Sequence, residues 1–234
     1  MKGIQFEIEG NYAHFRKPET NNNPLSHDFI TKTALIGMIG AVLGKERDEM
    51  RSLFPRLSED LLYGVQIINP VKKESWGFTM HKVKKMSDMA PKYMELLKFP
   101  KFQIAIALYN THEQTKKLFD EFTKSIKNNK SKYTPVLGLH NCPAKLTFLS
   151  EGEFSDEKND NFKTKYIVST KHEINIKETE QFRIGFEHIP TFQNDDFWNP
   201  PDKYVDIIYP SENNEITING KYYEYSNGDK LWLI

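Results

Sequence analysis

The chain has 234 residues, and its 32 Lys and Arg balance its 32 Asp and Glu. This length is enough for one large domain or two small ones with a substantial core. The single cysteine, Cys142, excludes an internal disulfide framework, and no apolar run of about 18 residues is present to span a membrane. No export signal precedes the alternating residues 2–9, so we expect a soluble, cytoplasmic protein.

The zero net charge hides an asymmetry along the chain. Residues 151–234 contain 9 Lys and Arg against 17 Asp and Glu, so the basic excess lies in residues 1–150. Within that part, residues 70–101 hold eight lysines against three acidic residues. Such a segment attracts polyanions by counterion release, although most lysine-rich segments are solvated surface. We expect RNA contacts in the first part and protein contacts in the acidic second part.

Hydrophobic periodicity predicts a series of elements over residues 1–150. In chain order they are a strand at 2–9, a loop at 10–28, a helix at 30–44 capped by Gly44, a short helix near 46–53, a strand at 61–68, the lysine-rich insertion 70–101, a strand at 102–109, a helix at 111–129 and a strand from Ala144. The order βαββαβ predicts an α+β domain of the ferredoxin-like or RNA-recognition type.

After residue 150 the chain becomes acidic and rich in strand patterns. Asn219-Gly220 and Asn227-Gly228 are typical of hairpin turns. We therefore expect residues 151–234 to form a small β-rich C-terminal region.

The first candidate site is the junction between the polar loop and the helix at 30–44. A helix N-terminus binds anions because its first amides are unpaired and the positive end of its dipole points outward. The basic and hydroxyl residues at this junction are Arg16, Lys17, Thr31, Lys32 and Thr33. They predict a phosphate site, with the alternative that the charges are solvated and the helix is simply part of the core.

Three segments together resemble the Cas-five family of CRISPR-associated proteins, which belongs to the RAMP superfamily. They are FRKP at 15–18, PLSHDFITKTALIGMIGAVLGKERDE at 24–49 and YTPVLGLHNCPA at 133–144. In type I interference complexes (Cascade), this family's subunit caps the end that holds the 5′ handle of the crRNA. The resemblance covers residues 1–150 and is loose beyond them.

The resemblance implies that the insertion at 70–101 forms a thumb across the 5′-proximal crRNA. Lysines would hold phosphates there, and an aromatic or long apolar side chain would wedge between bases. Thumb residues assigned to RNA on this basis are Lys73, Trp76, Phe78, Met80, His81, Lys82, Lys84 and Lys85. The residues of the junction match the family's basic loop and helix start, which implies contacts with the crRNA backbone.

The segment 133–144 departs from some relatives, which carry arginines where this chain has Leu139, His140 and Asn141. RNA contact from this segment therefore rests on His140. The structural interpretation of the segment is a core-anchored Tyr133, a Gly138 at positive φ, a buried Cys142 thiol and a turn at Pro143.

The resemblance is nearest to noncatalytic, type I-B-like members, in which a separate Cas-six nuclease cuts the RNA. It implies as partners the crRNA 5′ handle, the Cas-seven backbone subunit and the Cas-eight large subunit, with target DNA near the PAM a further candidate. No membrane partner and no cofactor are expected. No metal is expected either, because no His-Glu-x-x-His spacing occurs and His140 with Cys142 offers too few ligands.

Two other functions remain open. Type I-C members cleave pre-crRNA without metal, and the residues available here for such general acid–base chemistry are Tyr12, His14, His81 and Lys82. Against this, His81 and Lys82 are neighbours and would point to opposite faces of a strand. The third candidate is a protein-interaction module with no role in RNA binding.

Overall fold

The computed structural model describes residues 1–20, 22–82, 85–175, 182–194, 201–211 and 213–234, without the side chains of 82–88. Its elements are β1 (Lys2–Glu9), β2 (Tyr12–Ala13), α1 (Lys32–Leu43), α2 (Arg47–Asp60), β3 (Leu61–Ile67), β4 (Lys73–Lys82), β5 (Lys85–Lys98), β6 (Lys101–Leu108), α3 (Glu113–Lys127), β7 (Lys145–Glu153), β8 (Lys158–Thr164), β9 (Val168–Ser169), β10 (Glu173–Ile174), β11 (Ile184–Phe192), β12 (Lys203–Pro210), β13 (Ile216–Glu224) and β14 (Lys230–Leu231). The fold is mixed α+β, as expected. Within these ranges, no helix is long and apolar enough to cross a membrane.

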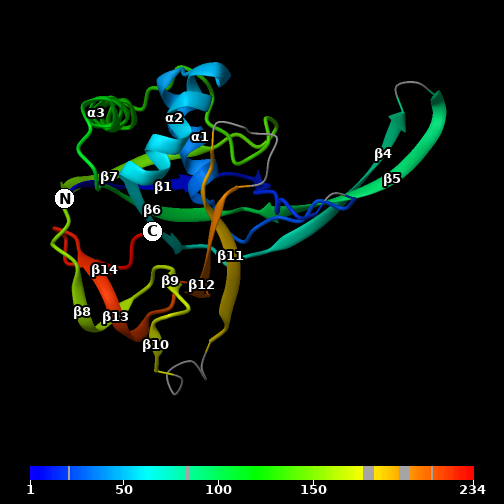
Figure 1. Cartoon of the computed structure of the whole chain (residues 1–234). Helices are drawn as coiled ribbons and strands as arrows, with labels where there is room; N and C mark the ends of the chain where they lie inside the picture. Colours follow the sequence, from blue (N-terminus) through cyan, green and yellow to red (C-terminus); the bar gives the residue numbers. More distant parts are fainter. Residues whose placement is uncertain (21, 83–84, 176–181, 195–200, 212) are drawn as a thin grey trace.

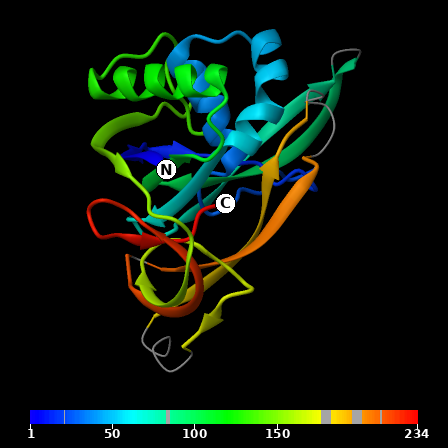
Figure 2. The same cartoon turned by 60° about the vertical axis from the view of Figure 1, so that its left-hand side comes forward.

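The centre of the molecule is a four-stranded antiparallel sheet in the order β3-β6-β1-β7. In β1, the alternating residues Ile4, Phe6 and Ile8 are fully buried, which explains why this stretch is a strand. Helices α1, α2 and α3 lie on one side of the sheet and β8, β10, β13 and β14 on the other, while β11 and β12 run past the sheet and β11 reaches α1 and α2 (Figures 1 and 2). The central strands are therefore covered on both faces.

Helix α3 packs through the apolar face predicted for residues 111–129. Its buried residues include Leu118, Phe119, Phe122 and Ile126. Phe122 meets Phe6 of β1 edge to face, with 5.6 Å between ring centroids. Because burying each such side chain contributes about 2 kcal/mol, this face is sufficient to hold the helix against the sheet.

Helix α1 confirms the predicted helix and its cap. Thr31 is the N-cap, and its hydroxyl accepts a hydrogen bond from the Ala34 amide at 3.3 Å. Gly44 ends the helix in the left-handed conformation, with φ 71°. A Cβ on Gly40 would lie 2.5 Å from the Met50 sulfur of α2, so this glycine allows the two helices to pack closely.

Helix α2 is longer than the short helix expected near 46–53. It continues to Asp60 although it contains Pro55. Glu46 and Glu49 form a capping box at its start, and Leu53 and Leu57 are buried on either side of the proline. A proline inside a helix costs about 3 kcal/mol, and the buried leucines offset this cost through packing that local sequence rules do not include.

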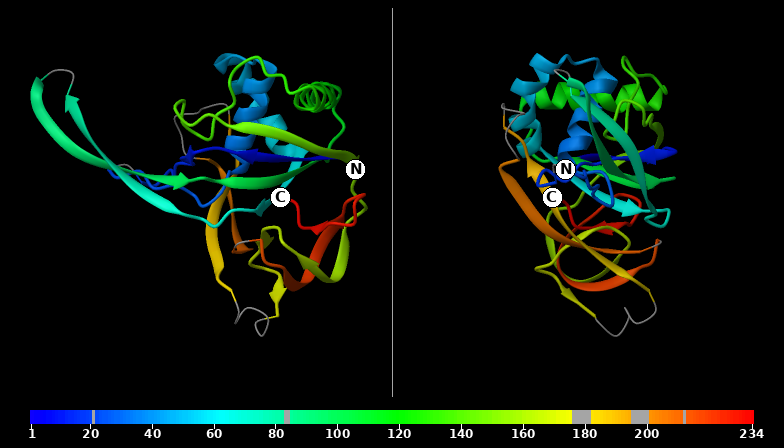
Figure 3. Two further views of the ribbon diagram at one scale, coloured as in Figure 1. Left: turned by 180° about the vertical axis from the view of Figure 1, so that it is seen from behind. Right: turned by 90° about the vertical axis from the view of Figure 1, so that its right-hand side faces the viewer.

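The insertion 70–101 is a long antiparallel hairpin of β4 and β5, which extends away from the rest of the molecule (Figures 1 and 3). Its register pairs Lys73 with Leu97 at the root and His81 with Met89 near the far end. The short strand β2 pairs with the root of β5 and completes a three-stranded sheet.

The C-terminal strands form two small sheets, β11-β12-β9 and β10-β13-β14, with β8 paired to β13. The turn predicted at Asn227-Gly228 is confirmed, since Gly228 has φ 92° and connects β13 to β14. The turn predicted at Asn219-Gly220 is wrong, because both residues lie inside β13. Pairing of β13 with β8 and burial of Ile216 and Ile218 decide its conformation.

The main hydrophobic core includes side chains from both parts of the chain. Ile189 of β11 and Ile207 and Tyr209 of β12 belong to the same buried cluster as β1, α1 and β6. The Tyr209 ring meets Phe29 edge to face, with 5.7 Å between centroids. The C-terminal strands thereby fix the position of the residues that lead into α1.

Gly138 lies against the backbone of another segment. It has φ 87°, as expected for a glycine in the 133–144 segment, and a Cβ would lie 1.9 Å from the His14 carbonyl oxygen. Gly228 has φ 92° but no atom within 4 Å of such a Cβ, so it is a matched control for backbone strain alone.

We predict that Gly138→Ala lowers the free energy of unfolding by about 3 kcal/mol, whereas Gly228→Ala lowers it by about 1 kcal/mol. The difference arises from the steric clash with the backbone of His14. Urea unfolding of the two variants measures both values, and equal losses would contradict the close approach of the two segments.

Candidate nucleic-acid interface

A cleft of about 910 Å³ lies where several segments distant in sequence meet. It is lined by the loop before α1, by α1 itself, by the root of β5, and by the 133–144 segment. The lining residues are His14, Phe15, Arg16, Pro18, Pro24, Thr31, Thr33, Ala34, Gly37, Met38, Ala41, Phe54, Met94, Val136, Gly138, Leu139, Pro190, Gln193 and Pro201. The three regions that the sequence analysis singles out therefore share one concave surface.

Helix α1 contributes small residues to this surface. Thr33, Ala34, Gly37 and Ala41 line the cleft. A Cβ on Gly37 would meet only the Phe54 ring, at 3.9 Å, so this glycine faces open space rather than a packed neighbour. The small side chains on this face leave room for a flat ligand to approach the helix.

Polar groups lie at the helix start. The Thr33 hydroxyl is 3.0 Å from the Thr31 hydroxyl, which itself caps the helix. Arg16 is exposed, lines the cleft, and its Nη2 donates to the Thr20 carbonyl oxygen at 3.4 Å. A cation and a hydroxyl beside a helix N-terminus form a surface that is suited to an anion.

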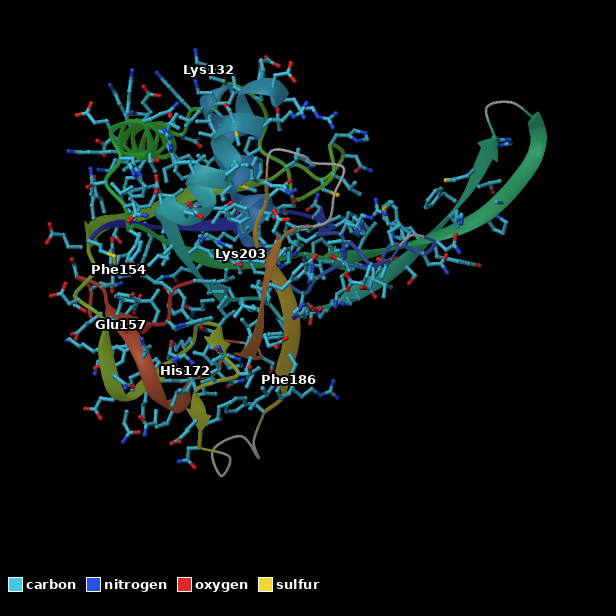
Figure 4. All side chains as sticks on the ribbon, in the orientation of Figure 1. Lys132, Phe154, Glu157, His172, Phe186 and Lys203 are labelled. Carbon is cyan, nitrogen blue, oxygen red and sulfur yellow. The ribbon has the colours of Figure 1, made fainter. Side chains whose placement is uncertain are left out.

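Lys32 is not at the surface, so the phosphate contact expected of it is not available to its ammonium group here. The residue is only 4% exposed, and Nζ donates to the Ile234 carbonyl oxygen at 3.1 Å. Burial, and to a smaller extent the charge of Lys203 on β12, labelled in Figure 4, together lower the pKa of Lys32 to about 7. The first turn of α1 points this side chain inward, toward β3 and the last residues.

Lys17 is engaged within the protein. Its Nζ lies 2.9 Å from Glu187 Oε2, and the ring of the buried His27 lies 3.0 Å from the same oxygen. Burial by itself would raise the pKa of Glu187, but the contacts with His27 and Lys17 lower it overall. The expected RNA contact of Lys17 competes with this internal ion pair.

One face of the hairpin continues the cleft. Met94 lines the cleft and pairs with Trp76 across the ladder. Strand periodicity places Phe78 and Met80 on the same face as Trp76. These three side chains are 42%, 40% and 49% exposed, which is unusual for large apolar residues in a row. The wedge residues expected from the sequence thus form one apolar stripe that starts at the cleft.

The remaining residues assigned to the thumb do not belong to this apolar stripe. Lys73 lies at the hairpin root in a cluster of ion pairs with Asp28 and Glu95. His81 is exposed and belongs to the opposite face from Trp76. The side chains of Lys82, Lys84 and Lys85 lie outside the described residues.

The residues proposed for RNA cleavage do not converge where the structure describes them. The Tyr12 ring contacts Trp76 at the root, with 4.8 Å between centroids, whereas His81 is five residues further along β4. His14 is 3% exposed, and its Nδ1 donates to the Glu95 carbonyl oxygen at 2.7 Å. Burial lowers the pKa of His14, which favours the neutral imidazole.

The 133–144 segment agrees with expectation at Gly138 and Cys142 but not at Pro143 or Tyr133. Pro143 forms a β-bridge with Val136 instead of a turn. Cys142 is buried, and burial raises the pKa of its thiol. His140 is exposed but does not line the cleft. Tyr133 is 47% exposed and donates to a Glu46 carboxylate oxygen, so a core anchor is wrong. Its backbone amide instead satisfies the Ala41 carbonyl near the end of α1.

Several lining residues have no signal in the sequence. Pro190, Gln193 and Pro201 come from the acidic C-terminal part, far from the resembling segments. Met94 belongs to the insertion, where the exposed aromatics dominate the pattern. In the part of the chain that the structure describes, no three His, Cys, Asp or Glu side chains gather as a metal site would require. Metal independence stays a prediction.

The buried Lys32 makes stability depend on pH. Because its pKa of about 7 is below the ordinary value of 10.5, the unfolded chain binds more protons between these pH values. The contribution of Lys32 to stability therefore improves as the pH rises from 7 toward 10.

We predict that the free energy of unfolding of Lys32→Met, relative to that of the wild type, falls by about 2 kcal/mol between pH 7 and pH 9. Chemical unfolding of both proteins across this range measures the difference. A difference that does not change with pH would show that the ammonium group keeps its ordinary pKa.

Three solved structures have folds similar to that of this chain. A CRISPR protein from Archaeoglobus fulgidus is 14% identical and superposes with a TM-score of 0.60 over 98% of both chains. A chain of a CRISPR RNA-guided surveillance complex is 13% identical, with a TM-score of 0.51 over 89% of this chain and 90% of that one. A chain of the Type III-B Cmr-beta complex is 9% identical, with a TM-score of 0.51 over 92% and 86%.

No curated protein matches the sequence. Residues 3–196, in contrast, match the family described as CRISPR-associated protein (Cas_Cas5). This range includes the loop before α1, the hairpin, the 133–144 segment and part of the C-terminal strands. The chain belongs to the Cas5 (Cas-five) family of CRISPR-associated proteins.

Proposed function

We propose that this chain is the crRNA-binding subunit of a type I CRISPR effector complex, and that the cleft and the hairpin hold the 5′ handle. One observation carries the proposal. The cleft between α1 and the 133–144 segment continues through Met94 onto the exposed face of Trp76, Phe78 and Met80. Membership of the Cas5 family supports it.

The two parts of this surface suit the two parts of a nucleotide. Arg16, Thr33 and the N-terminal end of α1 offer positive charge and hydroxyl groups for phosphates. The apolar stripe on the hairpin offers side chains on which bases stack, each worth about 1 to 3 kcal/mol. A single strand that leaves the cleft would meet the stripe directly.

The core supports the same assignment. We propose that β1, β3, β6 and β7 with α1 and α3 form a ferredoxin-like domain, because β1 and β6 are the central strands and all neighbouring strands are antiparallel.

Similarity of fold to chains of a surveillance complex and of Cmr-beta supports assembly into an effector complex. The proposed partners are the Cas-seven and Cas-eight subunits, and target DNA near the PAM.

We propose that the subunit is noncatalytic. The positions of Tyr12, His14 and His81 favour this, since His14 is buried against the Glu95 carbonyl and the other two lie apart along the hairpin. In-line cleavage of RNA needs a base and an acid that both reach one phosphate.

The binding prediction compares two exposed aromatic residues. Trp76→Ala should weaken binding of a labelled handle RNA by about tenfold, because it removes a stacking surface. Phe186 on β11 is 69% exposed and does not line the cleft, so Phe186→Ala should leave the affinity unchanged. Fluorescence anisotropy gives both affinities, and equal effects of the two substitutions would exclude the hairpin face as the RNA surface.

A second prediction concerns charge. Arg16→Ala should weaken handle binding and reduce the slope of log affinity against log salt by about one, as expected for one lost phosphate contact. Titrations at several salt concentrations measure the slope. An affinity that does not depend on salt would instead favour a protein-interaction module.

The third prediction is that the purified chain leaves repeat RNA intact in EDTA. Denaturing gels of end-labelled repeat RNA provide the measurement. A specific cut that is lost in Tyr12→Phe, His14→Ala or His81→Ala would show that the chain is a metal-independent endoribonuclease.

A further inference from the structure

We propose that the ion cluster of Lys73, Asp28 and Glu95 sets the angle at which the hairpin leaves the body, so that these three are positioning residues for the hairpin face. The inference deepens the proposed function, and it rests on that function only for its consequence for RNA. The structural claim can be tested without RNA.

Lys73 Nζ lies close to three oxygen atoms at the hairpin root. It lies 2.7 Å from Asp28 Oδ1 and 3.0 Å from Glu95 Oε1, and it donates to the Ser26 carbonyl oxygen at 3.0 Å. Burial by itself would lower the pKa of Lys73, but the contacts with Asp28 and Glu95 raise it overall. The ammonium group therefore stays charged and joins β4 to β5 and to the loop.

The acceptors are themselves fixed to the body. Asp28 accepts a hydrogen bond from the Tyr209 hydroxyl of β12 through its second oxygen. Glu95 accepts from the Ser26 amide at 3.1 Å, and its own amide donates to the Pro24 carbonyl oxygen at 3.0 Å. His14 donates to the Glu95 carbonyl oxygen. The cluster thus connects the hairpin root with the loop before α1 and with a C-terminal strand.

The cluster lies at the root of a long hairpin, so a small rotation there displaces the far end by several ångströms. A two-stranded ribbon has little rigidity of its own in water, and this one extends away from the body (Figure 3). With a rise of about 3.3 Å per residue, His81 lies about 26 Å beyond Lys73, so a turn of about 10° at the root moves it by about 5 Å. The same turn moves Met80, about 23 Å beyond Lys73, by about 4 Å, and Trp76, about 10 Å beyond it, by about 2 Å, so the angle at the root changes where the apolar stripe points relative to the cleft.

Removing the cation should change the root geometry. In Lys73→Met, the Asp28 and Glu95 carboxylates, which are 16% and 19% exposed, would face each other without a counter-charge. Lys72 is the adjacent lysine and is exposed, so Lys72→Met removes the same charge from the same root without touching the cluster.

The experiment measures hairpin orientation by pulsed EPR. Spin labels are placed at Met89→Cys on the hairpin and Lys116→Cys on α3, both exposed, in a Cys142→Ala background that removes the only native cysteine. We expect Lys73→Met to shift or broaden the distance distribution by about 5 Å or more. Lys72→Met should preserve the distribution, and Lys73→Arg should restore part of it.

Handle RNA adds a second measurement. Lys73→Met should weaken binding more than Lys72→Met, whereas Trp76→Ala should weaken binding without changing the distance distribution. Thermal unfolding shows whether Lys73→Met is folded. If it is not, Glu95→Gln replaces it, and we expect the same change in the distance distribution. An unchanged distribution in the folded variant overturns the inference. If Lys73→Met changes the distribution but the wild-type chain itself binds no handle RNA, the result supports the inference and refutes the proposed function.

Discussion

The loop that precedes α1 is held by buried polar contacts that no single element could satisfy. Ser26, His27 and Asp28 are inside the protein, and their partners lie on the hairpin, on β11 and on β12. Burying such groups without partners would cost several kcal/mol, so the loop, the hairpin root and the C-terminal strands adopt their positions together. The start of α1, the lining of the cleft and the direction of the hairpin all depend on this constraint.

This arrangement explains how one surface combines polar and apolar character. The inner lysines, Lys17 and Lys32, take part in the protein's own contacts, while Arg16 remains at the cleft. On the hairpin, the ladder directs Trp76, Phe78 and Met80 outward because no second layer covers that face. Residues of like chemistry therefore have different roles, and burial rather than residue type decides between them.

Much of the fold follows from local patterns. Strand alternation in β1 and the amphipathic face of α3 predict these elements because each buries one face on the central sheet. The same rules fail where tertiary contacts override local preference. Pro55 stays inside α2 because neighbouring leucines are buried, and Asn219-Gly220 lies within a strand because β8 pairs with it.

The sequence by itself determined the order of the elements, the insertion between the second and third core strands, and the residues of family resemblance that meet at the cleft. It could not decide which basic residues face solvent, since the orientation of Lys32 and the ion pairs of Lys17 and Lys73 depend on partners up to 202 residues away. Only the tertiary structure brought Pro190 and Gln193 to the cleft and Tyr209 to Asp28. Local sequence specifies backbone periodicity, whereas charge burial and cleft shape arise from long-range packing.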